Sequence, residues 1–179
     1  AGIAAFVIDP FGRRGVTSTV SNQAQYSFAA SAWDVLAAAE LLGALAEIDS
    51  SRIGAQGHSR GGSAILTAAT LHEISANASR PALCGAYAAY PWSGQQFLNP
   101  RVGETIVRSV IGSADEWCSP TQVQGHMQAM RLMGADATFK LFEKAQHSFD
   151  RDTPVELIED ASVAPNAPIA YMDDTGAFI

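Results

Sequence analysis

The sequence predicts an α/β fold, a doubly wound, mostly parallel sheet with flanking helices. Two observations lead to this prediction. Short apolar runs alternate along the chain with longer segments of helical periodicity. Several of these runs are also followed at once by a loop with a chemically reactive side chain, which is typical of the carboxyl ends of parallel strands. Strands separated by helices require crossover connections, and these favour a parallel sheet.

The first half of the chain predicts two strands and two helices. Residues 3–8 form an apolar run that predicts a buried strand ending before Asp9 and Pro10. Residues 53–56 predict a second strand, and a helix is expected from residue 59 to about residue 71 or 74. An alanine-rich helix is predicted over 23–45, with one apolar stripe made by Trp33, Leu36, Ala37, Leu41 and Leu45.

The second half predicts three more strands, over 83–90, 106–111 and 137–142. A helix is expected over 120–133, because Ser119 can cap it, Pro120 suits its first turn and Gly134 can end it. Residues 171–179 resemble a hairpin around an Asp-Asp-Thr-Gly turn.

The most informative motif is Gly-His-Ser-Arg-Gly-Gly at residues 57–62, between a predicted strand and a predicted helix. A serine on such a tight turn is the pattern of a nucleophile elbow, in which Gly57 and Gly61 would leave room for the bend. The helix that follows would direct its unpaired N–H groups at negative charge near Ser59, and the backbone N–H of Arg60 is the expected oxyanion donor. A simpler alternative is that Ser59 only caps the helix.

Two later loops complete the pattern. Asp115 follows the strand 106–111 after a turn at Gly112, and His147 follows the strand 137–142. Because the carboxyl ends of parallel strands meet at one crevice, both should approach Ser59. The order serine, aspartate, histidine is the triad order of α/β-hydrolases, with Ser59 as nucleophile, His147 as base and Asp115 as the acid that orients it.

The other histidines and acids fit the pattern less well. His58 is expected to point away from the site, whereas His72 and His126 fall on predicted helices. Each of the three is predicted to be a surface or packing residue. Among the acids, Glu116 and Asp150 are expected in solvent, and Asp136 lies at the wrong end of a strand.

Composition limits the remaining functional classes. The chain has 179 residues, of which 47% are apolar, and a formal net charge of −7. This length suits one domain over 1–179, and the acidic charge without a basic run predicts no nucleic-acid binding. No run is long enough to predict a membrane span. Cys84 and Cys118 are expected at opposite ends of the sheet, too far apart for a disulfide, and are predicted to be free thiols.

The segments 9–15, 49–62, 112–117 and 146–150 together resemble the dienelactone hydrolase family of α/β-hydrolases. The resemblance covers most of residues 3–150. It implies an α/β-hydrolase fold lacking its first strands, a small-molecule ester substrate, no cofactor or metal, and catalysis by Ser59, Asp115 and His147. Dienelactone hydrolase itself uses a cysteine nucleophile, so the serine at position 59 favours an ordinary ester. The loop that supplies a second oxyanion N–H in the family has no counterpart in this chain.

Some predictions from the residues stay open at this point. Trp92 and Trp117 are expected either to wall an acyl pocket or to pack under loops. Arg14 and Arg60 are expected either to bind a substrate carboxylate or to be solvated or paired with acids. A peptidase resembling prolyl oligopeptidase and a catalytically inactive binding domain with the same fold are alternative functions. Because the chain opens in an apolar run, we expect it to be part of a longer protein, a piece that on its own could be inactive or unstable.

Overall fold

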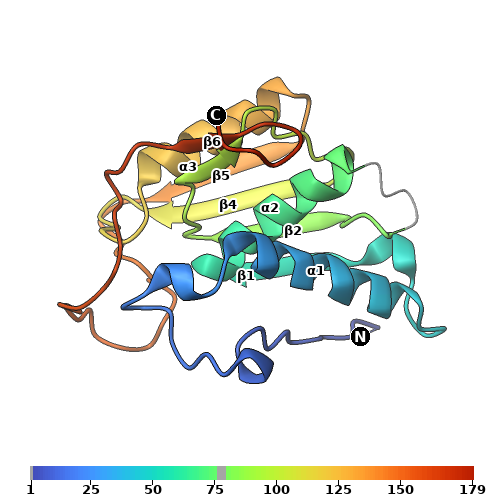
Figure 1. The fold of residues 1–179 in the computed structure, drawn as a ribbon, viewed down its shortest axis with the longest axis horizontal. Coiled ribbons are helices and arrows are strands. Elements are labelled where there is room, and N and C mark those ends of the chain that lie inside the picture. Colours follow the sequence, from blue (N-terminus) through green and yellow to red (C-terminus); the bar gives the residue numbers. More distant parts are fainter. Residues whose placement is uncertain (1, 76–79) are drawn as a thin grey trace.

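The computed structural model describes residues 2–75 and 80–179. Its main sheet has four parallel strands in the spatial order β1 (Gly54–His58), β2 (Gly85–Ala89), β4 (Ile106–Gly112) and β5 (Ala137–Phe142). Two short parallel strands, β3 (Gln95–Phe97) and β6 (Ala170–Met172), form a separate pair. The mostly parallel sheet with flanking helices is confirmed (Figure 1).

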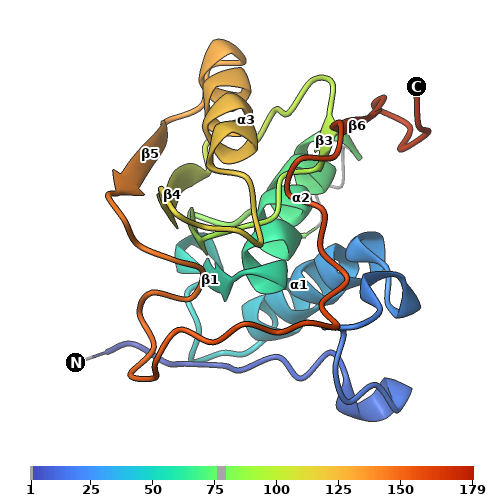
Figure 2. The same cartoon turned by 90° about the vertical axis from the view of Figure 1, so that its left-hand side faces the viewer.

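The helices α1 (Phe28–Gly43), α2 (Arg60–Ile74) and α3 (Pro120–Leu132) lie on one face of this sheet (Figure 2). Strand side chains on that face are small or apolar, and one continuous core joins them to all three helices. On the other face, Gln56, Tyr87, Thr138 and Lys140 are exposed. Within the described residues, the helices therefore cover a single face of the sheet.

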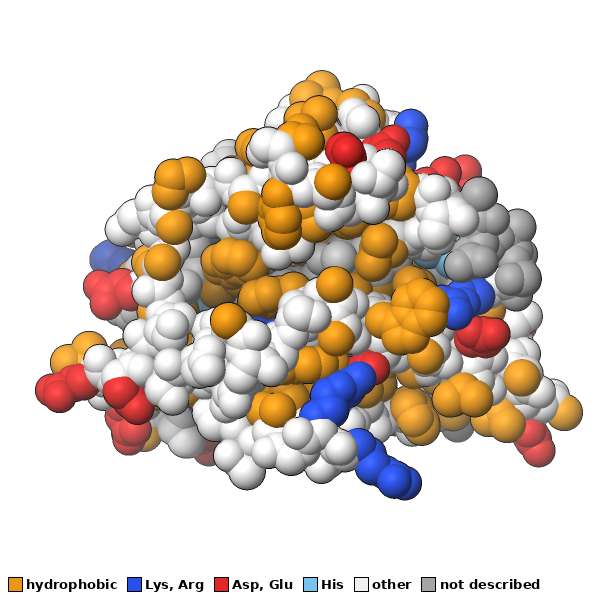
Figure 3. Space-filling view, viewed as in Figure 1, with side chains coloured by type: hydrophobic (Ala, Val, Ile, Leu, Met, Phe, Trp, Pro, Cys, Tyr) orange, Lys and Arg blue, Asp and Glu red, His pale blue; other side chains and the backbone are white. Residues whose placement is uncertain are grey.

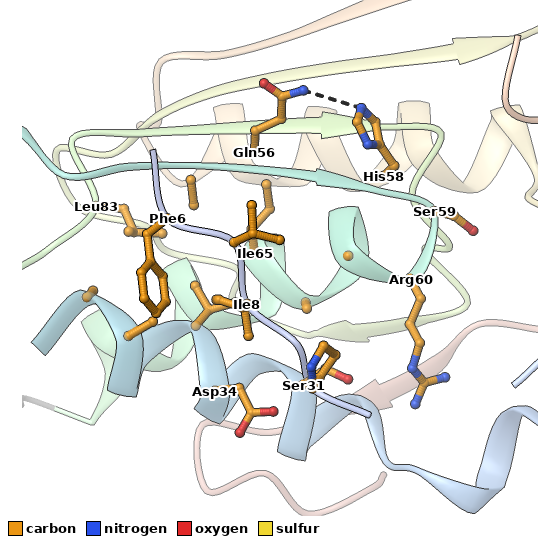
Figure 4. A pocket seen from close by; sticks show the side chains of 18 of the residues that line it. Phe6, Ile8, Ser31, Asp34, Gln56, His58, Ser59, Arg60, Ile65 and Leu83 are labelled. Carbon is orange, nitrogen blue, oxygen red and sulfur yellow. Dashed lines mark hydrogen bonds between the residues drawn. The ribbon is translucent and has the colours of Figure 1, made fainter. Parts of the chain in front are cut away.

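The predicted strand at 3–8 is wrong. These residues pair with no strand among the described residues, and Ile3 and Val7 are 90% and 88% exposed. A strand needs a neighbour within hydrogen-bonding distance. Here a cleft of about 620 Å³ is lined on one side by residues 6–8 and on the other by the edge of β1, and no ladder joins the two segments (Figure 4).

The helix predicted over 23–45 is shorter, and its predicted apolar stripe is wrong except at Leu36, which is buried. Residues 23–25 form a separate 3₁₀ turn, and α1 begins where the Ser27 hydroxyl accepts the N–H of Ala30 at 3.0 Å. The predicted stripe residues Trp33, Leu41 and Leu45 are at least half exposed, and apolar side chains are spread over this face of the molecule (Figure 3). The buried face is instead built largely from small side chains, which let α1 pack close to α2: Ser31, Ala32, Val35, Leu36, Ala38 and Ala39.

The other predicted elements are present. β2, β4 and β5 fall within or close to their predicted ranges, and α3 begins with Ser119 as its cap and Pro120 in its first turn. Gly134 follows α3 with a left-handed φ of 95°. At the C-terminus, an antiparallel bridge between Met172 and Phe178 encloses the Asp-Asp-Thr-Gly turn.

Both cysteines are free thiols. None of the helices in residues 2–75 and 80–179 is both long and apolar enough to cross a membrane.

Candidate active site

Ser59 lies at the joint between β1 and α2, in a backbone conformation that serine rarely adopts. Its φ is 51° and its ψ is −119°, and its N–H donates to the carbonyl of Ala89 on β2 at 2.9 Å. Such a left-handed conformation costs free energy and is found preferentially at functional sites. Ser59 occupies the N-cap position of α2, yet its side chain accepts no capping hydrogen bond. The hydroxyl is therefore available for another partner.

Of the two glycines predicted to leave room for this joint, Gly57 is needed and Gly61 is not. A Cβ on Gly57 would lie 2.3 Å from the carbonyl carbon and oxygen of Gly61, so position 57 tolerates no side chain. A Cβ on Gly61 would meet nothing within 4 Å. The second close approach is at Gly62, where a Cβ would lie 3.1 Å from the Gly57 carbonyl oxygen and 3.2 Å from Pro91. The tight joint thus requires glycine at 57 and favours it at 62, while Gly61 is dispensable.

His147 and Asp115 complete a hydrogen-bonded chain that starts at Ser59. The His147 Nε2 lies 2.9 Å from the Ser59 Oγ, and its Nδ1 lies 2.8 Å from the Asp115 Oδ2. The side chain of Asp115 is fully buried and that of His147 is 12% exposed. The other carboxylate oxygen of Asp115 accepts the N–H groups of Trp117 and Cys118, each at 2.8 Å. These bonds fix the orientation of the carboxylate, which in turn fixes the imidazole.

The loops that carry the acid and the histidine are joined directly. Ala114 donates its N–H to the carbonyl of Ala145 at 3.0 Å, and Lys144 donates its N–H to the Ser113 hydroxyl at 2.8 Å. Gly112 makes this approach possible, since a Cβ there would lie 2.0 Å from the Ala145 carbonyl oxygen. The distance between Asp115 and His147 is therefore set by backbone contacts as well as by their own hydrogen bond.

Aromatic rings hold the His147 imidazole on two sides. Trp117 stacks on it with ring centroids 5.4 Å apart, and Tyr90 meets it edge-on at 4.8 Å. Tyr90 itself has a left-handed φ of 39°, and its hydroxyl donates to Asp150 at 2.7 Å. Burial, together with this hydrogen bond, raises the pKa of Tyr90 to about 12, so the hydroxyl stays a donor at neutral pH.

Tyr90 and Asp150 were not predicted as site residues. Asp150 is exposed, as expected, but it also anchors Tyr90 and lies 3.5 Å from the His58 Nε2. One signal for Tyr90 was present in the sequence, because it is the last residue of the predicted strand 83–90, which ends at the same sheet edge as Ser59. No sequence signal identified Asp150, whose role depends on how the loop after His147 folds back.

The competing histidines lie elsewhere. His58 points away from Ser59, toward Gln56 on the uncovered sheet face (Figure 4). His72 faces the carbonyl of Arg80. His126 is buried on α3 with Ser93 as its hydrogen-bond partner at 3.3 Å, and burial lowers its pKa to about 4.

Cys118 lies beside the hydrogen-bonded chain. Ligand atoms of Asp115, Cys118 and His147 lie within 4.8 Å of one another, a spacing compatible with a metal ion. Both ring nitrogens of His147 and both oxygens of Asp115 are already engaged in hydrogen bonds, and burial raises the pKa of the Cys118 thiol, which disfavours the thiolate that a metal would need. The cluster is thus better suited to proton transfer than to metal binding.

Arg14 and Arg60, the two arginines considered as substrate-binding residues, have different surroundings. Arg14 makes a two-pronged ion pair with Asp34, at 2.8 and 2.9 Å, and lies over the ring of Tyr26. The guanidinium of Arg60 lies 4.2 Å from the ring centre of Phe28 and donates to Gln23, and burial lowers its pKa. The paired state is therefore the one observed for Arg14. The backbone N–H of Arg60 opens α2, where helix N–H groups have no partner within the helix.

Comparison with known proteins identifies the family of this chain. The model of the dienelactone hydrolase family matches residues 9–170. The chain belongs to the dienelactone hydrolase family. Among solved structures, the acyl-protein thioesterase 2 of Zea mays is similar, with a TM-score of 0.51 and 17% sequence identity. The match covers 67% of this chain and 58% of the maize chain. This chain therefore spans less than two thirds of the length of the maize protein. No curated protein matches the sequence.

At that identity the maize structure informs the fold alone, which is the α/β-hydrolase fold. The family match and the fold together support a hydrolase. The identity of the nucleophile, the roles of its partners and the bond that is cleaved are separate questions.

Proposed function

We propose that this dienelactone hydrolase family member cleaves carboxylic esters through an acyl-enzyme on Ser59. One observation carries the proposal: the Ser59 hydroxyl, left uncapped at the start of α2, is within hydrogen-bond distance of an imidazole whose other nitrogen meets a buried carboxylate. This is the arrangement that turns a weak hydroxyl nucleophile into a strong one.

The first half of the reaction acylates the serine. The Ser59 oxygen forms a bond to the ester carbonyl carbon while His147 takes the hydroxyl proton, and the Arg60 N–H donates to the developing oxyanion. The carbonyl then re-forms, the bond to the leaving oxygen breaks, and His147 gives its proton to that oxygen to release the alcohol. Asp115 stabilises the charged imidazole between these transfers.

The second half returns the enzyme to its starting state. A water molecule gives a proton to His147 as its oxygen bonds to the acyl carbon. The bond from that carbon to Ser59 then breaks, the serine regains its proton from His147, and the carboxylic acid leaves. The maize relative is named an acyl-protein thioesterase, and the same steps would release a thiol from a thioester. Matched oxygen and sulfur esters of one acid would determine which leaving group is preferred.

Substitution of the nucleophile tests the proposal. Ser59→Ala should lower kcat for p-nitrophenyl acetate by about 10⁴-fold or more, and Asp115→Asn by about 10³–10⁴-fold. Ser75→Ala replaces an exposed serine at the far end of α2 and should leave turnover within about twofold of the parent protein. Turnover by Ser59→Ala within twofold of the parent would refute the assignment. Cleavage of peptides without any simple-ester turnover would favour the peptidase alternative.

A further inference from the structure

A second, smaller cavity of about 180 Å³ opens directly beside Ser59. Apart from Ser59, its walls are mostly apolar and come from distant parts of the chain. The main contributors are Phe28, Trp92, Trp117, Val163, Ala164 and Ala167. When the Ser59 hydroxyl attacks an ester, either the acyl chain or the leaving alkoxy group on the carbonyl carbon must lie next to it. The cavity occupies such a position.

The aromatic wall of this cavity is fixed by contacts outside it. The rings of Phe28 and Trp92 pack with centroids 4.6 Å apart, and the backbone N–H of Trp92 donates to the Ser63 hydroxyl on α2 at 2.9 Å. Trp117 stacks on His147. Because these rings are held by the same elements that position Ser59 and His147, the cavity keeps its place relative to the reacting atoms.

The charged side chain at the cavity, Arg60, does not make it an anion site. Its guanidinium is covered on one face by Phe28, and one terminal nitrogen donates to Gln23. The remaining nitrogens, Nε and Nη2, are buried by surrounding atoms and lack a partner among the described residues. A carboxylate in the cavity would lose its hydration, and it could reach these two donors only if the atoms that cover them moved.

The opposite wall is a strap, residues 162–167, from the segment that follows His147. Two hydrogen bonds hold it: the Ser162 N–H donates to the Val20 carbonyl, and the Gln122 side chain donates to the Ala167 carbonyl, each at 2.7 Å. The strap contributes only small side chains, those of Ser162, Val163, Ala164 and Ala167. The size of the cavity therefore depends on these small residues.

We propose that this cavity binds the acyl group of the substrate and selects uncharged esters of short apolar or single-ring acids, an inference that rests on the proposed function. An apolar cavity of about 150 Å³ in another protein accommodates benzene, so the present volume suits a benzoyl group or a chain of about four to six carbons. Within this cavity a longer chain would have to displace the strap, and a carboxylate-bearing acyl group would have to compete with Gln23 for the Arg60 guanidinium.

The test is a series of p-nitrophenyl esters of acetate, butyrate, hexanoate, decanoate, benzoate and hemiglutarate. For the parent protein, kcat/KM should be highest for butyrate, hexanoate or benzoate and about tenfold lower for decanoate and hemiglutarate. Ala164→Phe places a ring in the cavity and should lower kcat/KM for hexanoate and benzoate by about tenfold or more, with acetate changed by less than about threefold.

The matched control is Asn166→Phe, which adds the same ring to an exposed strap position outside the cavity lining. It should leave the whole series within about twofold of the parent. Ester hydrolysis that depends on Ser59 but is equal for all chain lengths, or is unchanged by Ala164→Phe, would overturn the acyl-pocket proposal alone. A preference for hemiglutarate would overturn it too. Hydrolysis that survives Ser59→Ala would instead overturn the proposed function.

Discussion

At the residue scale, the informative feature of the site is how many contacts each side chain of the proposed triad has besides those to the other two. His147 is bonded at both ring nitrogens and packed between Trp117 and Tyr90, and Tyr90 is in turn held by Asp150. Supporting contacts of this kind keep a catalytic group close to its productive geometry. We therefore regard Tyr90 and Asp150 as positioning residues for the imidazole.

Removal of the Tyr90 hydroxyl should show this role. Tyr90→Phe keeps the ring but loses the hydrogen bond to Asp150, so kcat for p-nitrophenyl acetate should fall by about fivefold to tenfold while KM stays within about twofold. Asp150→Asn keeps an acceptor oxygen and should retain most of the activity. Asp150→Ala should match Tyr90→Phe, and the double variant should be no worse than either single one. Additive losses in the double variant would show that the two residues act independently.

At the element scale, the joint between β1 and α2 depends on a single close backbone approach. Gly57→Ala forces a Cβ into the Gly61 carbonyl, so the free energy of unfolding should drop by about 3 kcal/mol and ester turnover should be lost. Gly61→Ala meets no atom and lies in the first turn of α2, where alanine is the better helix former. It should stabilise the protein by about 0.5 kcal/mol, as measured by urea denaturation. Equal destabilisation by both variants would contradict the described joint.

The elements differ in how well the sequence predicts them, for a physical reason. The strands that end at Ser59, Asp115 and His147, with α2 and α3, follow from local signals: apolar runs, Ser119 with Pro120, and a glycine-flanked serine. The prediction at 3–8 fails because strand formation depends on a partner that local sequence does not reveal. The stripe on α1 fails because helix packing there is governed by alanines, which allow close approach, while Trp33 lies outside with Arg80 against its ring.

The candidate site was predictable only in part for a related reason. Strand ends in a parallel sheet must converge, so three separate loops could be assigned to one crevice from the sequence. The cavity walls follow no such rule. Phe28 precedes the sheet and Ala164 lies in an irregular segment that follows it, and only tertiary packing brings them to Ser59.

At the scale of the whole molecule, the buried His126 should couple stability to pH. Its ordinary pKa of 6.5 falls to about 4 in the folded protein because burial disfavours the charged ring. Between these values the unfolded chain binds a proton that the folded chain does not, so stability should fall as the pH drops from about 6.5 to about 4, by about 3 kcal/mol in all.

Urea denaturation at pH 7 and pH 4.5 measures this coupling. His126→Gln removes the titrating group. Between pH 7 and pH 4.5 its free energy of unfolding should therefore fall by about 2 kcal/mol less than that of the parent protein. His72→Gln replaces a half-buried histidine on α2 and should keep the parental fall. An identical fall in the parent and in His126→Gln would show that His126 does not contribute.

The proposed catalysis depends on the reactivity of one hydroxyl, which covalent labelling measures most directly. Peptide mass spectrometry after reaction with a fluorophosphonate should place a single adduct on Ser59, and His147→Ala should form it at least about 100-fold more slowly. An unlabelled Ser59 in the folded protein, or an adduct formed equally fast without the His147 imidazole, would contradict the proposed mechanism.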